Sequence, residues 1–161
     1  MIDIEKIVTK LIYGRKYKPM NASEIAAHCN IDDSEYQQFC SRLRDLELKG
    51  VIVKVKKKQY ANPEKVNLLV GKLECNRKGF GFVVPVREGK SPDIYVNGAD
   101  MSSAMHGDIV VVRLPAPTKK GRRKRNRDSG QIVNVLHRAN ETVVGTFKRS
   151  KHLSYVAPDN Q

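Results

Sequence analysis

The chain has 161 residues, of which 30 are lysine or arginine and 17 are aspartate or glutamate, so its formal net charge at pH 7 is +13. This length suits one medium domain or two small ones, and 40% apolar residues suffice for a packed core. No apolar run approaches the roughly 20 residues of a membrane-spanning helix, and the N-terminal segment lacks the continuous apolar stretch of a signal peptide. The basic excess indicates a polyanionic partner, and the lack of a long apolar run leads us to expect no membrane partner.

The cysteines argue against a disulfide framework. Cys29, Cys40 and Cys75 are odd in number, widely spaced and outside any CxxC pattern. Reduced thiols in a cytoplasmic protein are therefore expected. The four histidines share no metal-ligand spacing, so we expect no metal site.

The N-terminal segment predicts two helices in succession. Gly14 is expected to end the first helix, and Asn21 with Glu24 has the spacing of a capping box for a second helix over Ala22–His28. The apolar residues of the first helix recur at helical spacing: Ile4, Ile7, Val8, Leu11 and Ile12.

A third helix is expected after Asp32 or Asp33, either of which can cap it. Its apolar stripe runs from Tyr36 to Leu48, and Gly50 occupies the position of a helix C-terminal glycine. Residues 51–61 then alternate as a hairpin with Lys56-Lys57-Lys58 at its turn.

Three helices followed by a basic hairpin predict an N-terminal winged helix-turn-helix domain over residues 1–65. This segment carries 13 basic and 9 acidic residues, a net charge of only +4. Docking of a protein, or packing against a neighbouring domain, is therefore an alternative to nucleic-acid binding. The cations expected to contact a duplex are Arg42, Arg44, Lys54, Lys56, Lys57 and Lys58.

Residues 66–140 predict a small barrel after a linker at Asn62-Pro63-Glu64. Five short strands at this spacing suggest an OB-fold, with one helical turn within Ala99–Met105. The expected strands are Leu68–Glu74, Phe80–Val86, Asp93–Val96, Asp108–Leu114 and Gly130–Leu136. Residues 67–161 hold 17 basic and 8 acidic side chains, so +9 of the net charge lies here.

The segment Lys78-Gly79-Phe80-Gly81-Phe82-Val83 is the most informative of the chain. Alternation places Phe80 and Phe82 on one face of a strand, and Asp93-Ile94-Tyr95-Val96 adds a third ring. Small glycine neighbours are expected to leave the ring faces open for unpaired bases to stack on. The alternative is that these aromatic residues fill the barrel core.

Cations accompany the aromatic residues. A segment without apolar residues, Thr118–Arg127, joins the last two expected strands and is predicted to be a mobile loop that contacts phosphates. Phosphate contacts from this loop should make the affinity for nucleic acid fall steeply as the salt concentration rises. The cations expected to contact RNA are Lys72, Lys78, Lys119, Lys120, Arg122, Arg123, Lys124, Arg125 and Arg127.

Four short segments resemble a bacterial cold-shock domain, and more narrowly the first cold-shock domain of the ribonuclease R family within the ribonuclease II superfamily. They are Gly71-Lys72-Leu73, Lys78-Gly79-Phe80-Gly81-Phe82-Val83, Asp93-Ile94-Tyr95-Val96 and His106-Gly107-Asp108. The order of modules strengthens the resemblance, because a winged helix precedes the barrel. Residues 135–140 and 143–147 resemble the family's step into a second cold-shock domain, which would begin at residue 141 and be incomplete at residue 161.

The resemblance implies an α+β chain that forms the RNA-binding N-terminal region of a 3′–5′ exoribonuclease. Such a region would capture single-stranded RNA and help to open structured RNA. The resemblance also implies magnesium in a catalytic domain beyond residue 161. We further expect a monomer in the cytoplasm. Within the chain the acidic residues are scattered, so we expect neither catalytic residues nor a cofactor here.

The chain departs from the cold-shock pattern at two points. It contains no tryptophan, so Leu73-Glu74-Cys75-Asn76 stands where free cold-shock proteins carry one, and Asn97 stands where a histidine is usual. Both departures remove stacking surface, so the barrel face alone should bind less tightly than a free cold-shock protein.

Other functions remain open at this point. A DNA-binding transcription regulator would use the winged helix as its reader, and a freestanding cold-shock RNA chaperone would use the barrel alone. The winged helix could also dock a ribosome or helicase partner. The preferred RNA sequence is not evident from the residues.

Overall fold

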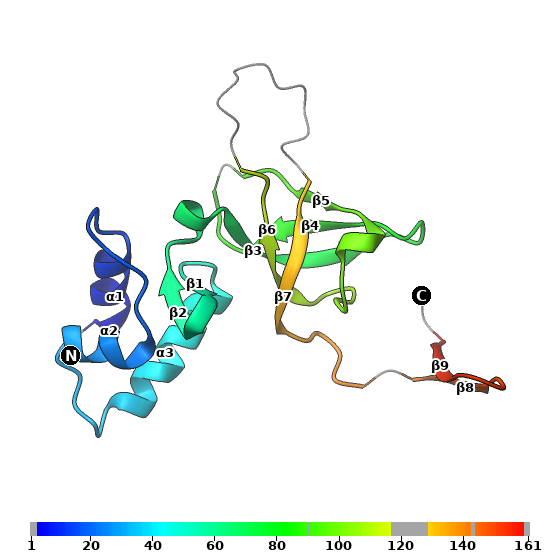
Figure 1. The fold of residues 1–161 in the computed structure, drawn as a ribbon, viewed down its shortest axis with the longest axis horizontal. Helices are drawn as coiled ribbons and strands as arrows, with labels where there is room; N and C mark the ends of the chain where they lie inside the picture. Colours follow the sequence, from blue (N-terminus) through cyan, green and yellow to red (C-terminus); the bar gives the residue numbers. More distant parts are fainter. Residues whose placement is uncertain (1–2, 90, 117–128, 143, 160–161) are drawn as a thin grey trace, which may run out of the picture.

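The computed structural model describes residues 3–89, 91–116, 129–142 and 144–159 (Figure 1). The chain is α+β, with three helices and a small hairpin followed by a five-stranded sheet and a second hairpin. The first part consists of α1 (Ile4–Ile12), α2 (Ala22–His28), α3 (Tyr36–Leu48), β1 (Val53–Val55) and β2 (Gln59–Ala61). We call residues 3–66 the helical module.

The start of α2 confirms the predicted capping box. The Asn21 side chain accepts a hydrogen bond from the Glu24 backbone N–H at 2.9 Å, and the Glu24 carboxylate accepts one from the Asn21 N–H at 2.8 Å. Two backbone donors that the helix cannot satisfy internally are thereby paired. The first helix begins similarly, because the Asp3 carboxylate accepts from the Lys6 N–H.

The start of α3 differs from the prediction. Neither Asp32 nor Asp33 caps the helix with its side chain; Glu35 is the N-cap, and it makes no side-chain capping bond. Instead the Asp32 and Asp33 carbonyls accept from the Glu35 and Tyr36 N–H groups in a preceding turn. The predicted end is confirmed, because Gly50 follows α3 with a φ of +70°, a conformation that glycine adopts without strain.

A single apolar cluster holds the helical module together. Phe39 and Leu43 of α3 are fully buried against Val8, Ile12 and Ile25 of the other two helices. Ile52 and Tyr60 extend the cluster into the hairpin. The hairpin is thus fixed against the helices by the same core that packs them.

The five-stranded antiparallel sheet has the strand order β5-β4-β3-β6-β7, which is consistent with an OB-fold. An isolated parallel bridge between Tyr95 and Ser129 brings its two edge strands together. Each strand matches its predicted range to within one residue at each end. The strands are β3 (Leu68–Cys75), β4 (Gly81–Pro85), β5 (Ile94–Val96), β6 (Ile109–Arg113) and β7 (Gln131–His137). We call residues 67–139 the barrel.

The inner faces of the barrel strands form an apolar core. Leu73, Val83, Val96, Val110 and Val112 are fully buried in one cluster. The helical turn expected within residues 99–105 is displaced, because the 3-10 helix there spans Gly98–Asp100.

The helical module and the barrel share a second apolar cluster. Val53 of β1 is buried with Val70 of β3 and Val111 of β6, on the outer face of the sheet. The expected linker also has structure, since a 3-10 helix covers Pro63–Val66 and Asn62 is buried. Figure 1 shows this helix and the β1–β2 hairpin between the helices and the sheet.

Polar contacts reinforce this junction. The guanidinium of Arg87 donates to the hydroxyl of Tyr13 at 2.6 Å and lies 3.7 Å from the Glu64 carboxylate. The Tyr13 hydroxyl in turn donates to the Val51 carbonyl at 3.0 Å. The barrel and the helical module are therefore tied by an apolar contact with a polar rim.

The C-terminal part forms the hairpin of β8 (Gly145–Arg149) and β9 (Ser154–Pro158). Several of its apolar side chains are exposed, among them Val144 and Phe147. The second barrel predicted to begin here remains a prediction. None of the helices in the described ranges is long and apolar enough to cross a membrane.

Candidate nucleic-acid interface

Three aromatic rings gather on the outer face of β4 and β5. The ring centroids lie 5.8 Å apart for Phe80 and Phe82, 5.5 Å for Phe80 and Tyr95, and 5.8 Å for Phe82 and Tyr95. Phe82 is 40% exposed and Tyr95 37%, while Phe80 is half-buried. We call these residues the aromatic cluster; they form a surface and are not part of the barrel core.

Strand alternation accounts for this surface. Phe82 pairs with Tyr95 across β4 and β5, whereas Gly81 and Val83 face the buried side. A Cβ atom on Gly81 would lie 2.9 Å from Cδ1 of Leu73, which is too close for a normal contact. Glycine is therefore needed at position 81 for packing in the core. The rings are exposed because they alternate with this buried residue along the strand, and not because a glycine leaves room beside them.

The turn from β3 to β4 positions Phe80 and Lys78. The Asn76 carbonyl accepts from the Gly79 N–H, its side chain accepts from the Lys78 N–H, and its own N–H donates to the Phe80 carbonyl at 2.7 Å. Gly79 has a φ of +86°. Its carbonyl oxygen occupies the space that a Cβ on Gly98 would need, so this turn lies directly against the end of β5.

Two of the predicted phosphate contacts, Lys72 and Lys78, lie in the barrel and are exposed. Neither forms an ion pair with any residue in the described ranges. Their charge is therefore available to a polyanion. The other predicted contacts of the barrel lie outside the described residues: Lys119, Lys120, Arg122, Arg123, Lys124, Arg125 and Arg127.

An acidic residue lies beside the aromatic cluster, and the sequence reasoning did not single it out. Glu74 of β3 is the Cα partner of Phe82 and is exposed on the same side of the sheet. A carboxylate in this position repels a phosphate backbone that passes over the rings. Only the strand register reveals this proximity, since Glu74 and Phe82 lie on different strands.

The cations predicted to contact a duplex fall into two groups. Arg42 and Arg44 of α3 and the hairpin residues 56–58 are exposed, and none pairs with a carboxylate in the described part of the chain. Lys57 and Lys58 both have a positive φ, and the three lysines of the turn are exposed to solvent. The structure thus leaves these cations unneutralised at the surface.

Lys54 differs from the other hairpin lysines. Its ammonium lies 3.3 Å from the carboxylate of Glu47, whose side chain is only 6% exposed, and 5.3 Å from the centre of the Tyr60 ring. Burial alone would lower the pKa of Lys54, but the Glu47 carboxylate and Tyr60 outweigh it and the pKa is raised. This charge is already engaged within the helical module.

A pocket of about 280 Å³ opens next to the aromatic cluster, with Tyr95 as a member of both. It lies where β5, the end of β6 and the start of β7 meet. Its lining consists of Tyr95, Asn97, Asp100, Arg113, Leu114, Pro115, Ser129, Gly130 and Gln131. The sequence reasoning placed Asn97 near the binding face but did not bring these residues together.

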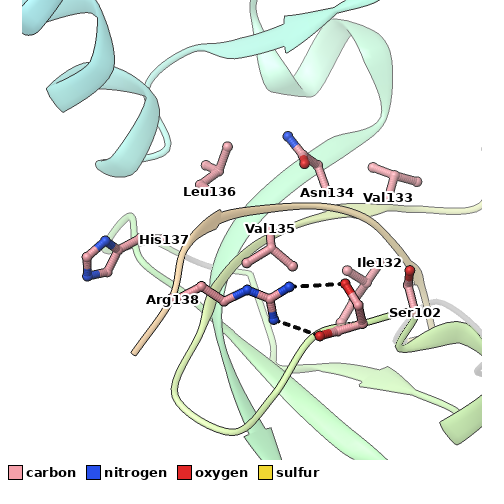
Figure 2. Close-up of a pocket in the computed structure, with 9 residues that line it drawn as sticks. Ser102, Ile132, Val133, Asn134, Val135, Leu136, His137 and Arg138 are labelled. Carbon is pink, nitrogen blue, oxygen red and sulfur yellow. Dashed lines mark hydrogen bonds between the residues drawn. The ribbon is translucent and has the colours of Figure 1, made fainter. Parts of the chain in front are cut away.

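A second pocket, of about 340 Å³, follows the outer edge of β7 and faces Ser102 (Figure 2). At its end the Arg138 guanidinium lies 2.9 Å from the Asp108 carboxylate, which is 1% exposed. Asp108 also accepts from the Met105 and Ala139 N–H groups. The arginine donates to the Ser103 carbonyl and hydroxyl as well, so this arrangement holds loops in place and leaves no free charge for a ligand.

The described residues contain no group of three or more histidine, cysteine, aspartate or glutamate side chains that could hold a metal ion. A two-metal hydrolase needs carboxylates that converge on ions about 4 Å apart. The acids of the described chain therefore do not fit a magnesium centre. Its cysteines are free thiols, and burial raises the pKa of Cys29 and Cys75.

Comparison with known proteins defines the class. The model of the ribonuclease B OB domain family matches residues 71–135, which cover most of the barrel. Ribonuclease R of Vibrio parahaemolyticus is 33% identical over 88% of this chain, and ribonuclease R of Escherichia coli is 30% identical over 91%. Ribonuclease R of Vibrio cholerae is 33% identical over 88% of this chain.

The chain belongs to the ribonuclease R/RNB family and corresponds to an N-terminal part of such a protein. It spans 17% of the length of each of these three relatives. Among solved structures, yeast Ssd1, a pseudonuclease, is 21% identical and gives a TM-score of 0.46 over 61% of this chain.

Proposed function

We propose that the barrel binds single-stranded RNA and delivers it to the catalytic part of a 3′–5′ exoribonuclease. The observation that carries this proposal is the aromatic cluster, in which the exposed rings of Phe82 and Tyr95 and the half-buried ring of Phe80 lie together on one sheet face. Apolar side chains that are exposed singly are common, whereas a contiguous exposed group of them marks a contact surface. Stacking of an unpaired base on such a ring contributes roughly 1–3 kcal/mol and tolerates any base.

Electrostatic attraction supports this role. Lys72 and Lys78 lie unpaired on the barrel, and the predicted loop 118–127 adds seven cations to the same domain. A basic surface beside stacking rings is the usual combination in proteins that bind single strands. We propose that these cations hold the phosphate backbone while the bases stack.

We further propose that the helical module is a winged helix that contacts duplex RNA and helps to open it. The support is the set of unneutralised cations on α3 and at the hairpin turn. Its shared core with the barrel would keep a duplex contact and a single-strand contact in a fixed relation. Docking of a protein partner through this module remains a competing proposal.

The hydrolysis itself is proposed to occur outside these residues, on magnesium held by another domain. We propose that β8 and β9 begin a second cold-shock barrel, and that the protein acts as a cytoplasmic monomer. The family membership and the scattered acids of the described chain support this division between RNA capture and catalysis.

The experiment is a fluorescence-anisotropy titration of labelled single-stranded RNA, duplex RNA and duplex DNA across a salt series. The test variant is Phe80→Ala/Phe82→Ala, and Phe147→Ala removes an exposed ring outside the barrel as a matched control. We expect the double variant to lose about 2 kcal/mol or more of single-strand binding, whereas Phe147→Ala should bind like the unmodified chain.

Two results would count against the proposal. Equal losses of single-strand affinity in the double variant and in Phe147→Ala would show that the aromatic cluster contributes no more to binding than an exposed ring elsewhere. Tighter binding of duplex DNA that survives the double substitution would move the function to the helical module, and the chain would then act as a DNA-binding regulator.

A further inference from the structure

The pocket beside Tyr95 differs in kind from the aromatic cluster. The cluster offers flat ring faces, which any base can cover, whereas the pocket is a concave space of about 280 Å³. This volume lies just below the ~300–1,000 Å³ of sites for drug-sized ligands. A single nucleobase is a ligand of suitable size. Because Tyr95 belongs to both sites, a base next to one stacked on Tyr95 would reach the pocket.

Among the polar side chains that line this pocket, four have no side-chain hydrogen-bond or ion-pair partner within the described ranges. They are Asn97, Asp100, Arg113 and Gln131. Asp100 is half-buried, while the others are exposed. Arg113 and Asp100 do not neutralise one another, because no ion pair joins them. The pocket therefore presents a strong donor and a strong acceptor to whatever enters it.

The way these groups are held makes the pocket a feature of the fold. Arg113 ends β6 and pairs in register with Gln131, the first residue of β7. Asp100 ends the 3-10 helix that follows β5, and its N–H donates to the Asn97 carbonyl at 2.9 Å. The Gly130 N–H donates to the Tyr95 carbonyl at 2.9 Å, which joins the two sides of the pocket.

We propose that this pocket recognises a guanine base, and the inference rests on the proposed binding of single-stranded RNA by the barrel. Guanine carries acceptors at O6 and N7, which suit the Arg113 guanidinium, and donors at N1 and N2, which suit the Asp100 carboxylate. Asn97 and Gln131 each supply one further donor and acceptor.

The other bases match this pair of side chains less well. Uracil has no exocyclic amine, so it offers the Asp100 carboxylate only its N3–H. Adenine has no exocyclic oxygen for Arg113, and cytosine has no N–H beside its amine. A base that covers Arg113 or Asp100 without pairing with it removes that group from water and gives it no partner in return, so specificity follows from the missing partner as much as from the one present.

The test measures affinity for short labelled oligouridylates in which one central position is uridine, guanosine, inosine, adenosine or cytidine. One good bidentate base contact is worth about 1–3 kcal/mol, and 1.4 kcal/mol corresponds to tenfold in affinity. We expect the guanosine oligomer to bind about tenfold tighter than the uridine oligomer. Inosine lacks only the N2 amine and should fall between them.

Asp100→Asn should remove most of the difference in affinity between the guanosine and inosine oligomers. Arg113→Gln should reduce the preference for the guanosine oligomer over the uridine oligomer. Glu141→Gln and Arg149→Gln, which change exposed charges outside the pocket by the same amounts, should preserve both preferences. The inosine comparison needs no substitution, so a variant that fails to fold would leave the test intact.

Equal affinity of the unmodified chain for all five oligomers would overturn the guanine pocket but leave the proposed function standing. A loss of binding to every oligomer by the same factor in Arg113→Gln would also overturn it, because that pattern marks a phosphate contact. Failure of the unmodified chain to bind even oligouridylate would instead refute the proposed function.

Discussion

At the scale of single residues, the environment of the aromatic cluster contains both attraction and repulsion for RNA. Phe82 offers a ring to a base, while Glu74 sits beside it across the strand pair. The affinity of the barrel face is therefore a balance that one substitution can shift.

Glu74→Gln should tighten single-strand binding, because it removes a charge that repels the backbone while preserving the size of the side chain. Exposed charge interactions are worth about 0.2–1 kcal/mol, so we expect an affinity gain of roughly 1.4- to fivefold at low salt. Anisotropy titration at two salt concentrations measures it, with the exposed Glu88→Gln as the control. A gain that did not shrink with added salt would not be electrostatic.

Arg138→Ala should destabilise the barrel, because it leaves the buried Asp108 carboxylate without its cation. The two backbone N–H groups remain as donors, so the cost should be near the ~1–3 kcal/mol of an unsatisfied buried group and below that of a fully orphaned charge. Urea unfolding would measure it. Arg149→Ala, on an exposed hairpin, should leave the midpoint unchanged, and an equal loss in both variants would contradict this account.

At the scale of elements, the short apolar runs between turns were sufficient to predict all five barrel strands to within one residue. Alternation was not needed in β6, which is buried on both faces because Val111 packs against the helical module. The predicted N-cap of α3 was wrong. The side chains of Asp32 and Asp33 suggested a cap, but these residues contribute only their backbone carbonyls, to a turn that precedes the helix. The aromatic cluster could be predicted from its i, i+2 spacing. Glu74 and the pocket could not, since they depend on strand register and on how distant loops meet.

The hairpin turn gives a prediction of its own. Lys56→Gln/Lys57→Gln/Lys58→Gln should weaken binding of duplex RNA and spare single strands, because these cations lie in the helical module, away from the rings. For double-stranded DNA, each phosphate contact contributes about 0.9 to the slope of log affinity against log salt. We expect the magnitude of the duplex slope to fall by up to about 3 if a similar dependence holds for RNA.

The control for the hairpin turn removes three cations from the β8–β9 hairpin: Lys148→Gln, Arg149→Gln and Lys151→Gln. These residues are also exposed, and their substitution removes the same total charge. A difference in salt slope between the two triple variants therefore reports the position of the cations and not their number. If both triple variants lower the duplex slope alike, the helical module has no specific duplex contact, and its role as a protein-docking module gains support.

At the scale of the whole molecule, the helical module and the barrel are coupled through Val53, Val70 and Val111. Val53→Ala should therefore lower the stability of both the helical module and the barrel. Hydrogen exchange followed by mass spectrometry should show faster exchange in β3 and β6 as well as in the helices. Val8→Ala removes an equally buried valine from the helical core alone, so it should affect the helices and leave β3 and β6 protected.

The shared cluster also determines how the parts of this chain can be studied. A barrel cut free of residues 3–66 would present Val70 and Val111, now buried, to water. Contiguous exposed apolar surface favours self-association. The truncated barrel should thus form oligomers as its concentration rises, and a weakened RNA affinity would then report on aggregation. The contribution of the helical module can be separated from that of the barrel only with the two still joined.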